Sequence, residues 1–468
     1  MALRSISFVS TISALKHHKF SRYLVLAPSR LCVHEHRLIA QQRPEKTRAA
    51  FSSMAQLADR FKGFDEPTVW HEFTPLANKH NAVNLGQGFP NWKAPDFVKQ
   101  ACVDAIQENF NQYARSEGHL PLCMVLAEHY SEALGRPIDP KSEVTIVNGV
   151  TGALTYVFQS ILNDGDEVIM LEPAYDSYPA VVQIFGGVSK FVPMRRISGR
   201  WQVDVKELEQ AFTPRTKAII INNPNNPLGI AFTRQELEAI SEVVSRHPGV
   251  LVLADEVYEF LTFDGRKHVP FASLPGMYER TFTMSSAGKT FSVTGWKIGW
   301  VVAPPSLSKG VQISVQWNVF TVHTSSSEAI ARAFKRAKMP YEGFPTYFDW
   351  LRDMYVTKRD KLLAMLKDAG IEADAPEGAF FVYANIEKFA VPESYLSKNG
   401  VKVPKDYAFC RWLTIEQGVT AIPPSAFFCP EHKYIGESYA RFAFCKTDED
   451  LAEAGKRLHK MALQHSNK

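Results

Sequence analysis

The stretch "SSAGKTFSVTGWKIGW", residues 285–300, contains two lysines whose roles have to be read from the rest of the chain. Its Gly-Lys-Thr tripeptide, 288–290, matches the end of a nucleotide-binding P-loop. The full motif is G-x-x-x-x-G-K-[ST], in which the first glycine opens a backbone nest around the phosphates. Thr283 stands where that glycine belongs, so the sequence argues against a P-loop NTPase. Lys289 and Lys297 therefore need another explanation.

Seven apolar runs of strand length surround and include part of this stretch, with helix-like amphipathic segments between some of them. They are 143–147, 167–173, 190–194, 217–224, 249–258, 281–286 and 298–304. Buried strands that alternate with helices are typical of an α/β domain with a mostly parallel sheet. Open sheets of this kind bind ligands at their strand ends, where this chain places polar residues.

Beyond residue 340 the pattern changes to longer helical segments with a few short strands. This change predicts a large α/β domain over 93–340 and a smaller α+β domain over 341–468. Residues 54–92 are interpreted as an N-terminal arm that joins the small domain.

The composition is that of an ordinary soluble protein of two or three domains, with 468 residues, 45% hydrophobic and 22% charged. We see no apolar run long enough for a membrane span. The six cysteines show no C-x-x-C spacing and no His/Cys cluster of zinc-site type, so we expect free thiols, a reducing compartment and no metal.

Positive charge is concentrated at the N-terminus. Residues 1–53 hold nine Lys or Arg against two acids, so the rest of the chain carries a small net negative charge and no basic character that suggests nucleic acid. The segment is Ser-rich and acid-poor, which is typical of a mitochondrial transit peptide; a basic tail without a targeting role is the alternative. An alternative start at Met54 would give a cytoplasmic form.

The stretch "NLGQGFPNW", 84–92, contains Gly86 and Gly88 but has Asn91 at the third glycine position of the dinucleotide fingerprint. It also follows no clear buried strand, so that fingerprint fails. The glycines are expected to form a turn whose backbone approaches a ligand closely.

Two further polar motifs end apolar runs. "INNPNNPLG", 221–229, combines a fixed Asn-Pro turn with a surplus of amide donors. In "ADEVY", 254–258, Asp255 and Tyr258 lie three residues apart where we expect the strand to turn into a helix, although Asp255 could simply cap that helix. Both side chains would then lie on the same side of the opening.

The order of these motifs resembles the fold type I pyridoxal-phosphate (PLP) enzymes of the aspartate aminotransferase superfamily. "NLGQGFP", "NNPLG", "DEVY", "SSAGKTFSVTGWKIGW" and "AIPPSAFF" are similar to the kynurenine aminotransferase, cysteine-S-conjugate β-lyase and glutamine transaminase K subfamily. The similarity runs from about Phe61 to the C-terminus. It implies a large domain with a mostly parallel seven-stranded sheet and a smaller α+β domain.

The resemblance assigns a role to each motif at the reacting end of the cofactor. Lys289 would form the Schiff base and then move the Cα proton, which requires a partly neutral amine. Asp255 would pair with the pyridine nitrogen, and Tyr258 and Asn226 would hydrogen-bond the ring 3′-oxygen. Lys297 would bind the phosphate, where many relatives have arginine.

The same resemblance places five further residues around the phosphate and the ring. The N–H groups of Gly149, Val150 and Thr151 begin a helix and suit a phosphate. Ser286 would add a hydroxyl, and Tyr175 would stack on the ring, unless it is an ordinary buried aromatic. Thr151 departs from close relatives that often have an aromatic there, which leaves the pocket size open.

By resemblance Arg441 would clamp the substrate α-carboxylate, because a guanidinium fits a carboxylate bidentately, with Gly88 and Asn226 assisting. Tyr113 would reach the phosphate of a neighbouring subunit, which implies an obligate homodimer with shared sites. No second arginine for a distal carboxylate is evident, so aspartate is a poor candidate substrate.

Aromatic residues are frequent at the family's pocket positions, although each could be core. They are Trp70, Phe89, Trp92, Tyr113, Trp317, Phe380 and Phe381. Such walls favour a large uncharged side chain. The expected reaction is ping-pong transamination of kynurenine, Phe, Tyr, Trp, Met or Gln with a 2-oxo acid. A β-lyase acting on cysteine conjugates and a catalytically silent PLP-fold module are the alternatives.

Overall fold

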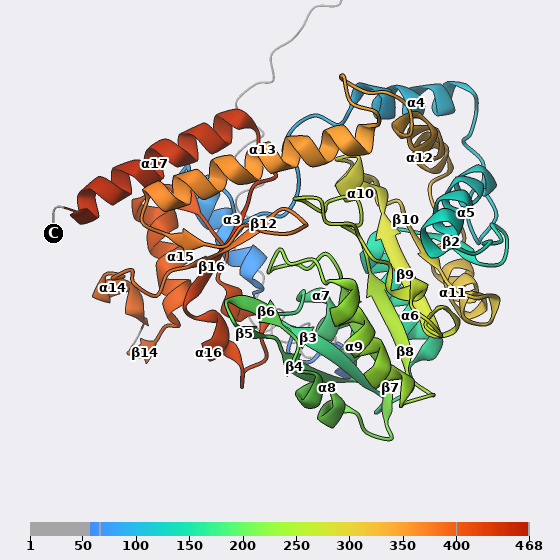
Figure 1. Ribbon diagram of the computed structural model, residues 1–468, viewed down its shortest axis with the longest axis horizontal. Coiled ribbons are helices and arrows are strands. Elements are labelled where there is room, and N and C mark those ends of the chain that lie inside the picture. The colour runs from blue at the N-terminus through green and yellow to red at the C-terminus, as the bar shows by residue number, and fades with distance from the viewer. Residues whose placement is uncertain (1–56, 65–66, 399, 467–468) are drawn as a thin grey trace, which may run out of the picture. The chain divides into compact units, whose positions relative to one another are not determined.

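The seven apolar runs all form strands of one sheet in the computed structural model, which describes residues 57–64, 67–398 and 400–466 (Figure 1). The order across the sheet is β2-β10-β9-β8-β7-β3-β4. The strands are β2 (Val144–Val147), β3 (Glu167–Glu172), β4 (Val188–Pro193), β7 (Thr216–Asn222), β8 (Leu251–Asp255), β9 (Thr281–Ser286) and β10 (Gly299–Val302).

The sheet is mostly parallel, as predicted. Only β10 runs antiparallel to its neighbours β2 and β9; the other adjacent pairs are parallel. The carboxyl ends of the parallel strands therefore meet at one edge. Gly299 lies opposite Ser286 in the β9–β10 pair, so the chain that leaves β9 returns to the same point of the sheet.

Helices cover both faces of the sheet because successive side chains of a strand point to opposite sides. In β7, Ile219 and Ile221 pack with one set of helices, whereas Ala218 and Ile220 pack with the other. Figure 1 shows α9 in front of the sheet and α6 behind it. The first set is α8 (Val205–Ala211) and α9 (Arg234–Ser245); the second is α6 (Gly149–Ile161), α7 (Ser177–Ile184) and α11 (Pro305–Asn318).

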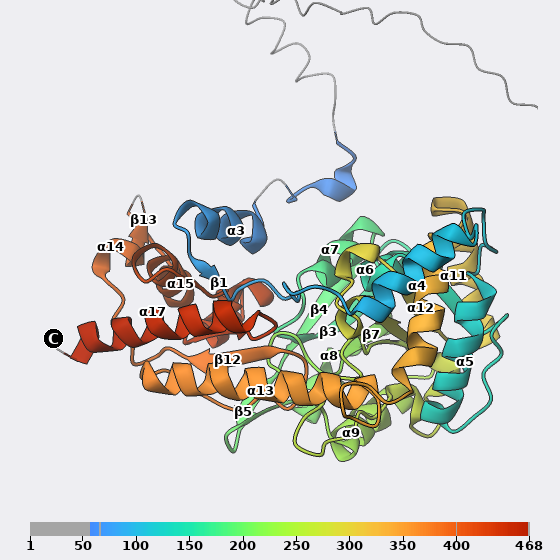
Figure 2. The same ribbon diagram turned by 90° about the horizontal axis from the view of Figure 1, so that it is seen from above.

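A three-stranded antiparallel sheet, β11-β12-β16, forms from the last part of the chain. Two long helices, α13 and α17, run side by side in this part, as Figures 1 and 2 both show. Their bounds and those of the small sheet are α13 (Tyr347–Asp368), α17 (Asp448–Ser466), β11 (Glu372–Ala373), β12 (Phe381–Asn385) and β16 (Tyr439–Ala443).

The beginning of the described chain contacts the same part. The short strand β1 (Val83–Asn84) pairs in parallel with β15 (Val419–Thr420), and α3 (Val69–Lys79) packs on α15 (Lys405–Glu416). "NLGQGFPNW" therefore begins within a two-residue strand, which the sequence did not reveal. Residues Asp59–Lys468 form one compact unit.

The remaining helices of four or more residues complete the chain. They are α4 (Asp96–Gln107), α5 (Leu120–Leu134), α10 (Ala287–Thr290), α12 (Thr324–Ala337), α14 (Glu393–Leu396) and α16 (Lys433–Gly436). Within the described ranges, no helix combines the length and apolar character needed to cross a bilayer.

The expected helix after Asp255 is wrong, because residues 257–260 form a turn. The Leu261 N–H still bonds to Tyr258 O, but the next groups bond elsewhere. Leu261 O accepts from the Ala379 N–H, and the Phe263 N–H donates to Glu377 O. These contacts with a segment more than a hundred residues later stop the helix, and short-range sequence patterns carry no trace of them.

Candidate active site

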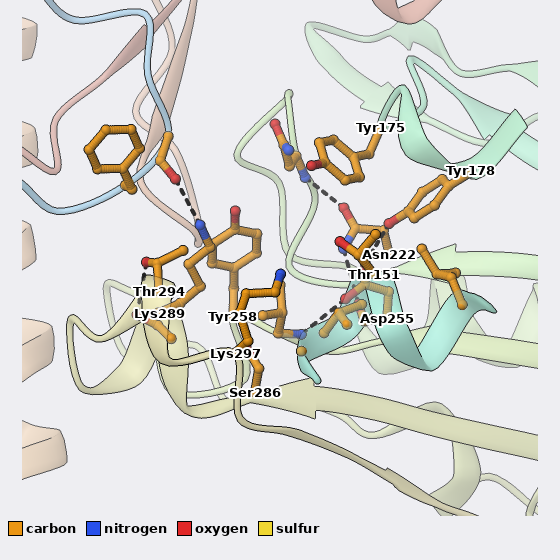
Figure 3. A pocket seen from close by; sticks show the side chains of 18 of the residues that line it. Thr151, Tyr175, Tyr178, Asn222, Asp255, Tyr258, Ser286, Lys289, Thr294 and Lys297 are labelled. Carbon is orange, nitrogen blue, oxygen red and sulfur yellow. Dashed lines mark hydrogen bonds between the residues drawn. The ribbon is translucent and has the colours of Figure 1, made fainter. Parts of the chain in front are cut away.

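A cavity of about 340 Å³ lies at the carboxyl ends of the parallel strands and gathers the predicted motifs (Figure 3). Of the predicted site residues, all but Tyr113 and Phe380 line it. They are Trp70, Gly88, Gly149, Val150, Thr151, Tyr175, Asn226, Asp255, Tyr258, Ser286, Lys289, Lys297, Phe381 and Arg441. Phe89, one of the predicted pocket aromatics, lines it as well.

Lys289 enters the cavity from α10, the four-residue helix that follows β9. Its Nζ donates a hydrogen bond to Gly88 O at 2.8 Å, drawn as a dashed line in Figure 3. The Phe380 ring lies behind it, with Nζ 5.7 Å from the ring centroid. The bond to Gly88 holds the amine beside the loop that sequence analysis expected to approach a ligand.

Burial lowers the pKa of Lys289 to about 8, because desolvation disfavours the ammonium form. The positive charges of Lys297, Arg441 and Lys446 act in the same direction. A substantial fraction of this amine is therefore neutral near pH 8, as a nucleophile or a base requires.

Asp255 ends β8 with its carboxylate buried. Oδ2 accepts a hydrogen bond from the Tyr178 hydroxyl at 2.6 Å, and Oδ1 accepts one from the Val257 N–H at 3.3 Å. Burial raises the pKa of Asp255 to about 6, although the Tyr178 bond opposes the shift. The group is thus largely ionised at pH 7, and both of these hydrogen-bond donors are neutral.

Arg441 lies in β16 and is only 1% exposed. Its Nη1 donates to Asn226 Oδ1 at 2.9 Å and its Nη2 to Gly86 O at 2.6 Å, but Nε has no partner in the described chain. Burial lowers the pKa of Arg441 to about 10, so it remains cationic at neutral pH. A buried guanidinium without a carboxylate partner indicates a site for an anion.

The start of α6 and Lys297 form a second anion site. Gly149 begins the helix with φ of +78°, and a Cβ at this position would lie 3.2 Å from Lys297 Nζ. Lys297 itself adopts a left-handed conformation with φ of +56°, which brings it to this helix end. Free N–H groups at a helix N-terminus, with a lysine beside them, suit a phosphate.

Aromatic side chains wall the remaining space. The Phe381 ring lies 4.3 Å from the Arg441 guanidinium carbon, and Trp70 lies 5.3 Å from it. Trp70 is fixed by a 2.6 Å hydrogen bond from Nε1 to Asp176 Oδ2. Tyr175 contacts Tyr178 edge to face, with ring centroids 5.7 Å apart.

Four predicted aromatics do not line the cavity of this single chain. Phe380 lies behind Tyr258, with ring centroids 5.1 Å apart, and so supports the wall from outside. Trp92 packs against Tyr355. Tyr113 is 78% exposed and Trp317 is 79% exposed, far too open for either to belong to a core.

Sequence reasoning missed several lining residues, of which Tyr178 and Asn222 contribute most. Tyr178 lies one helical turn after Tyr175 in "EPAYDSY", so this spacing could have indicated it. Asn222 donates to Asp255 O at 3.0 Å and accepts from the Asn226 N–H at 2.7 Å. It joins the two motifs that sequence analysis treated separately. The others are Gln87, Leu154, Val257, Gly288, Thr294 and Ile298.

Comparison with known proteins identifies the class. The aminotransferase class I and II family matches residues 80–458. Kynurenine–oxoglutarate transaminase of Dictyostelium discoideum is 42% identical over 415 residues, covering 84% of this chain and 94% of that protein. Kynurenine–oxoglutarate transaminase 1 of Homo sapiens is 38% identical over 418 residues, covering 87% and 98%.

A solved structure agrees with these relatives. N-succinyldiaminopimelate aminotransferase of Mycobacterium tuberculosis superposes with a TM-score of 0.78 at 35% identity, covering 87% of this chain and all of that one. The chain therefore belongs to the class I and II aminotransferases. It is a PLP-dependent enzyme of fold type I, as the motifs predicted.

The cavity residues fit pyridoxal phosphate. Asp255, a buried carboxylate with neutral hydrogen-bond donors, suits the protonated pyridine nitrogen. A Cβ at Gly149 would crowd Lys297 Nζ at 3.2 Å, so the glycine suits the close approach of a phosphate at this helix start. Lys289 supplies the amine that a cofactor aldehyde needs.

Proposed function

We propose that this aminotransferase uses a large neutral or aromatic L-amino acid as donor and a 2-oxo acid as acceptor. This proposal rests mainly on the environment of Arg441. Its guanidinium is buried, its Nε has no partner in the described chain, and it lies next to the aromatic rings of Trp70 and Phe381. Arg441 would take the α-carboxylate and the wall would take the side chain. The other cationic side chains that line the cavity in the described chain are Lys289 and Lys297.

The names of the relatives support kynurenine as one donor and 2-oxoglutarate as an acceptor. Kynurenine carries an aromatic ring with a polar substituent, which matches walls that combine rings with occasional polar groups. Thr151 is a small side chain at the cavity wall and would leave room for such a donor.

When bound, PLP supplies an electron-withdrawing ring that stabilises negative charge at the substrate Cα. Arg441 fixes the α-carboxylate and thereby orients the Cα–H bond toward Lys289. Neutral Lys289 Nζ would accept the proton from the substrate Cα and deliver it to the cofactor carbon that carried the aldehyde. Tyr258 and Asn226 hold their polar groups toward the same space, while Asp255 keeps a negative charge at the far end.

The test is an absorption experiment on the purified enzyme with a panel of single amino acids. Phenylalanine and kynurenine should convert the bound cofactor to its amino form, and 2-oxoglutarate should restore the original spectrum. Aspartate should react at least about tenfold more slowly, because the cavity lining of the described chain offers no second arginine for the side-chain carboxylate of aspartate. Faster reaction with aspartate than with phenylalanine would overturn the proposed donor class.

The comparisons do not favour β-elimination from cysteine conjugates as the main activity. The same site could still eliminate a good leaving group at Cβ, since both reactions begin with loss of the Cα proton. Pyruvate release from a cysteine conjugate, compared with the transamination rate for the same conjugate, measures this partition. A ratio above one would make the lyase activity dominant.

We also propose a homodimer whose two sites are shared between subunits. The support is the exposure of three aromatic side chains, Tyr113, Trp317 and Phe320. Tyr113 and Phe320 are packed edge to face, with ring centroids 5.0 Å apart, so these two rings contact each other although both are exposed. Sedimentation of the purified protein as a monomer at micromolar concentration would exclude this arrangement.

We propose a mitochondrial matrix location for the full-length chain, with a cytoplasmic form from a start at Met54. The targeting segment, 1–53, lies outside the described residues, so its composition alone supports the proposal. N-terminal sequencing of the protein from isolated mitochondria tests it. A mature form that still begins at Met1 would contradict import with cleavage.

A further inference from the structure

A cluster outside the cavity joins three side chains that can bind a metal. Glu172 is the last residue of β3, whereas Cys429 and His432 lie between the 3₁₀ turn Pro424–Phe427 and α16. Their donor atoms all lie within 4.8 Å of one another. Sequence spacing could not reveal the cluster, because 257 residues separate Glu172 from Cys429.

The distances between the donor atoms suit a small tetrahedral ion. Cys429 Sγ lies 3.3 Å from His432 Nδ1 and 3.7 Å from Glu172 Oε2, and Nδ1 lies 2.6 Å from Oε2. Tetrahedral zinc holds such atoms about 3.3–3.6 Å apart, because its bonds are about 2.0–2.3 Å long. Two of the three separations are close to these values, and the third needs to open by roughly 0.7 Å.

The surroundings resemble a built site more than a chance group of surface residues. Glu172 is fully buried and Cys429 is 8% exposed, while the His432 side chain reaches solvent. The Cys429 N–H donates to Glu172 Oε1, which leaves Oε2 to face the other two ligands. Such outer bonds orient metal ligands.

A fourth ligand is available on the solvent side. Glu431 is exposed and lies between the ligands Cys429 and His432 in the sequence. A mixture of thiolate, imidazole and carboxylate donors matches the preferences of zinc better than those of calcium or magnesium.

We propose that Glu172, Cys429 and His432 form a zinc site, completed by Glu431 or a water molecule. Coordination forms a zinc–sulfur bond and releases the thiol proton of Cys429 to solvent. The proton in the 2.6 Å bond between His432 Nδ1 and Glu172 Oε2 moves to His432 Nε2 or to solvent, so that both atoms can bind the ion. The ion would fasten the end of β3 to the loop after Phe427. The backbone already joins these segments next to the site, where the Ala174 N–H donates to Phe427 O at 2.8 Å. Tyr175, which lines the active cavity, is the next residue.

The test is zinc binding by the reduced holoenzyme, followed by competition with a chromophoric chelator that absorbs where the cofactor does not. Wild type should bind one zinc per chain at this site. Cys429→Ser and His432→Gln should each weaken that binding by about 100-fold or more. Cys102→Ser and His459→Gln are the matched controls, and both should retain wild-type zinc affinity.

The His432→Gln variant is expected to fold normally, because the His432 side chain is partly exposed and its replacement leaves no buried cavity. Cofactor content and the unfolding temperature of each variant, measured without zinc, show whether it folds. Absence of zinc binding by wild type at micromolar zinc would overturn the proposal. Equal zinc affinity in wild type and both ligand variants would do so too, because the ion would then sit elsewhere.

Discussion

Among single residues, Asp255 is one whose substitution we expect to have a large effect on the reaction rate. If Asp255 pairs with the pyridine nitrogen, as we propose, Asp255→Asn removes that negative charge but keeps the side chain's shape, so the ring loses its protonation partner. We expect the half-reaction with phenylalanine to slow by at least about 100-fold, with the fold intact. Stopped-flow absorbance measures the rate. Tyr178→Phe is the control, because it removes only one hydrogen bond and should cost much less.

A second residue-scale prediction concerns the pH dependence of Lys289. Its pKa of about 8 lies below the ordinary lysine value, so the reactive neutral form increases as pH rises through 8. The rate at which cofactor-free enzyme takes up PLP covalently should therefore rise with pH and level off above the midpoint. A flat profile between pH 6 and 10 would contradict the assigned environment.

Lys446 should move that midpoint. Its Nζ donates to Gln87 O at 2.8 Å and to Phe89 O at 3.2 Å, so it also holds the loop that presents Gly88 to Lys289. Lys446→Met removes a positive charge near Lys289 and should shift the uptake midpoint to higher pH. Lys446→Arg keeps the charge and should leave the midpoint close to that of wild type. Equal uptake midpoints for the Lys446→Met variant and wild type would exclude an effect of the Lys446 charge on the pKa of Lys289.

At the scale of elements, the start of α6 depends on glycine for two reasons. Gly149 has positive φ, and an added Cβ would lie 3.2 Å from Lys297 Nζ. Gly149→Ala should weaken PLP binding by at least about tenfold. The backbone strain costs roughly 1–2 kcal/mol, and the new methyl group crowds the Lys297 ammonium that we expect to bind the phosphate. Equilibrium dialysis measures the affinity.

Gly165→Ala is a matched control for that substitution. Gly165 also has positive φ, +85°, but nothing lies within 4 Å of an added Cβ. It should therefore lower the unfolding temperature through strain and leave PLP affinity unchanged. Equal loss of affinity in both variants would mean that strain alone, and not crowding at Lys297, explains the effect.

Most strands of the large sheet were predictable because they are buried on both faces and form continuous apolar runs. The edge strand β4 is the exception, since it is buried only at its end. The turn after Asp255 was not, since contacts with residues 377–379 end it. The cavity residues were predictable from motif order, which the family resemblance converts into roles. The spacing of Tyr178 from Tyr175 could have indicated that it lies at the site, but its bond to Asp255, 77 residues away, could not be predicted from local sequence.

For the whole molecule, we propose a large domain over 93–340 and a small domain over 341–468, joined by the arm 54–92. The pairing of β1 with β15 and the packing of α3 on α15 support the arm's assignment. Limited proteolysis of the holoenzyme should cut first in the loop between α12 and α13. Preferred cleavage within residues 93–330 would contradict the proposed boundary between the large and the small domain.

The proposed homodimer with shared sites leads to a prediction that only a mixture of two variants can test. Tyr113→Ala and Lys289→Ala should each be nearly inactive at limiting PLP. Equimolar remixing should restore about a quarter of wild-type activity, because half of the dimers then contain one complete site. If Tyr113 acts on the site of its own chain, or on none, remixing restores nothing. A mixture of wild type with the Lys289→Ala variant is the control that shows whether subunits exchange between dimers.

The return of the chain from Ser286 to Gly299 has a genetic consequence. The segment between them carries both active-site lysines, and its two ends lie opposite each other on neighbouring strands. A recombination event that exchanges only this segment would therefore transfer both lysines at once without changing the strand register. Insertions or deletions between Lys289 and Lys297 would change the spacing of the two lysines, whereas those in the surface loops elsewhere would not. Selection should tolerate swaps of the entire segment far better than changes in its length.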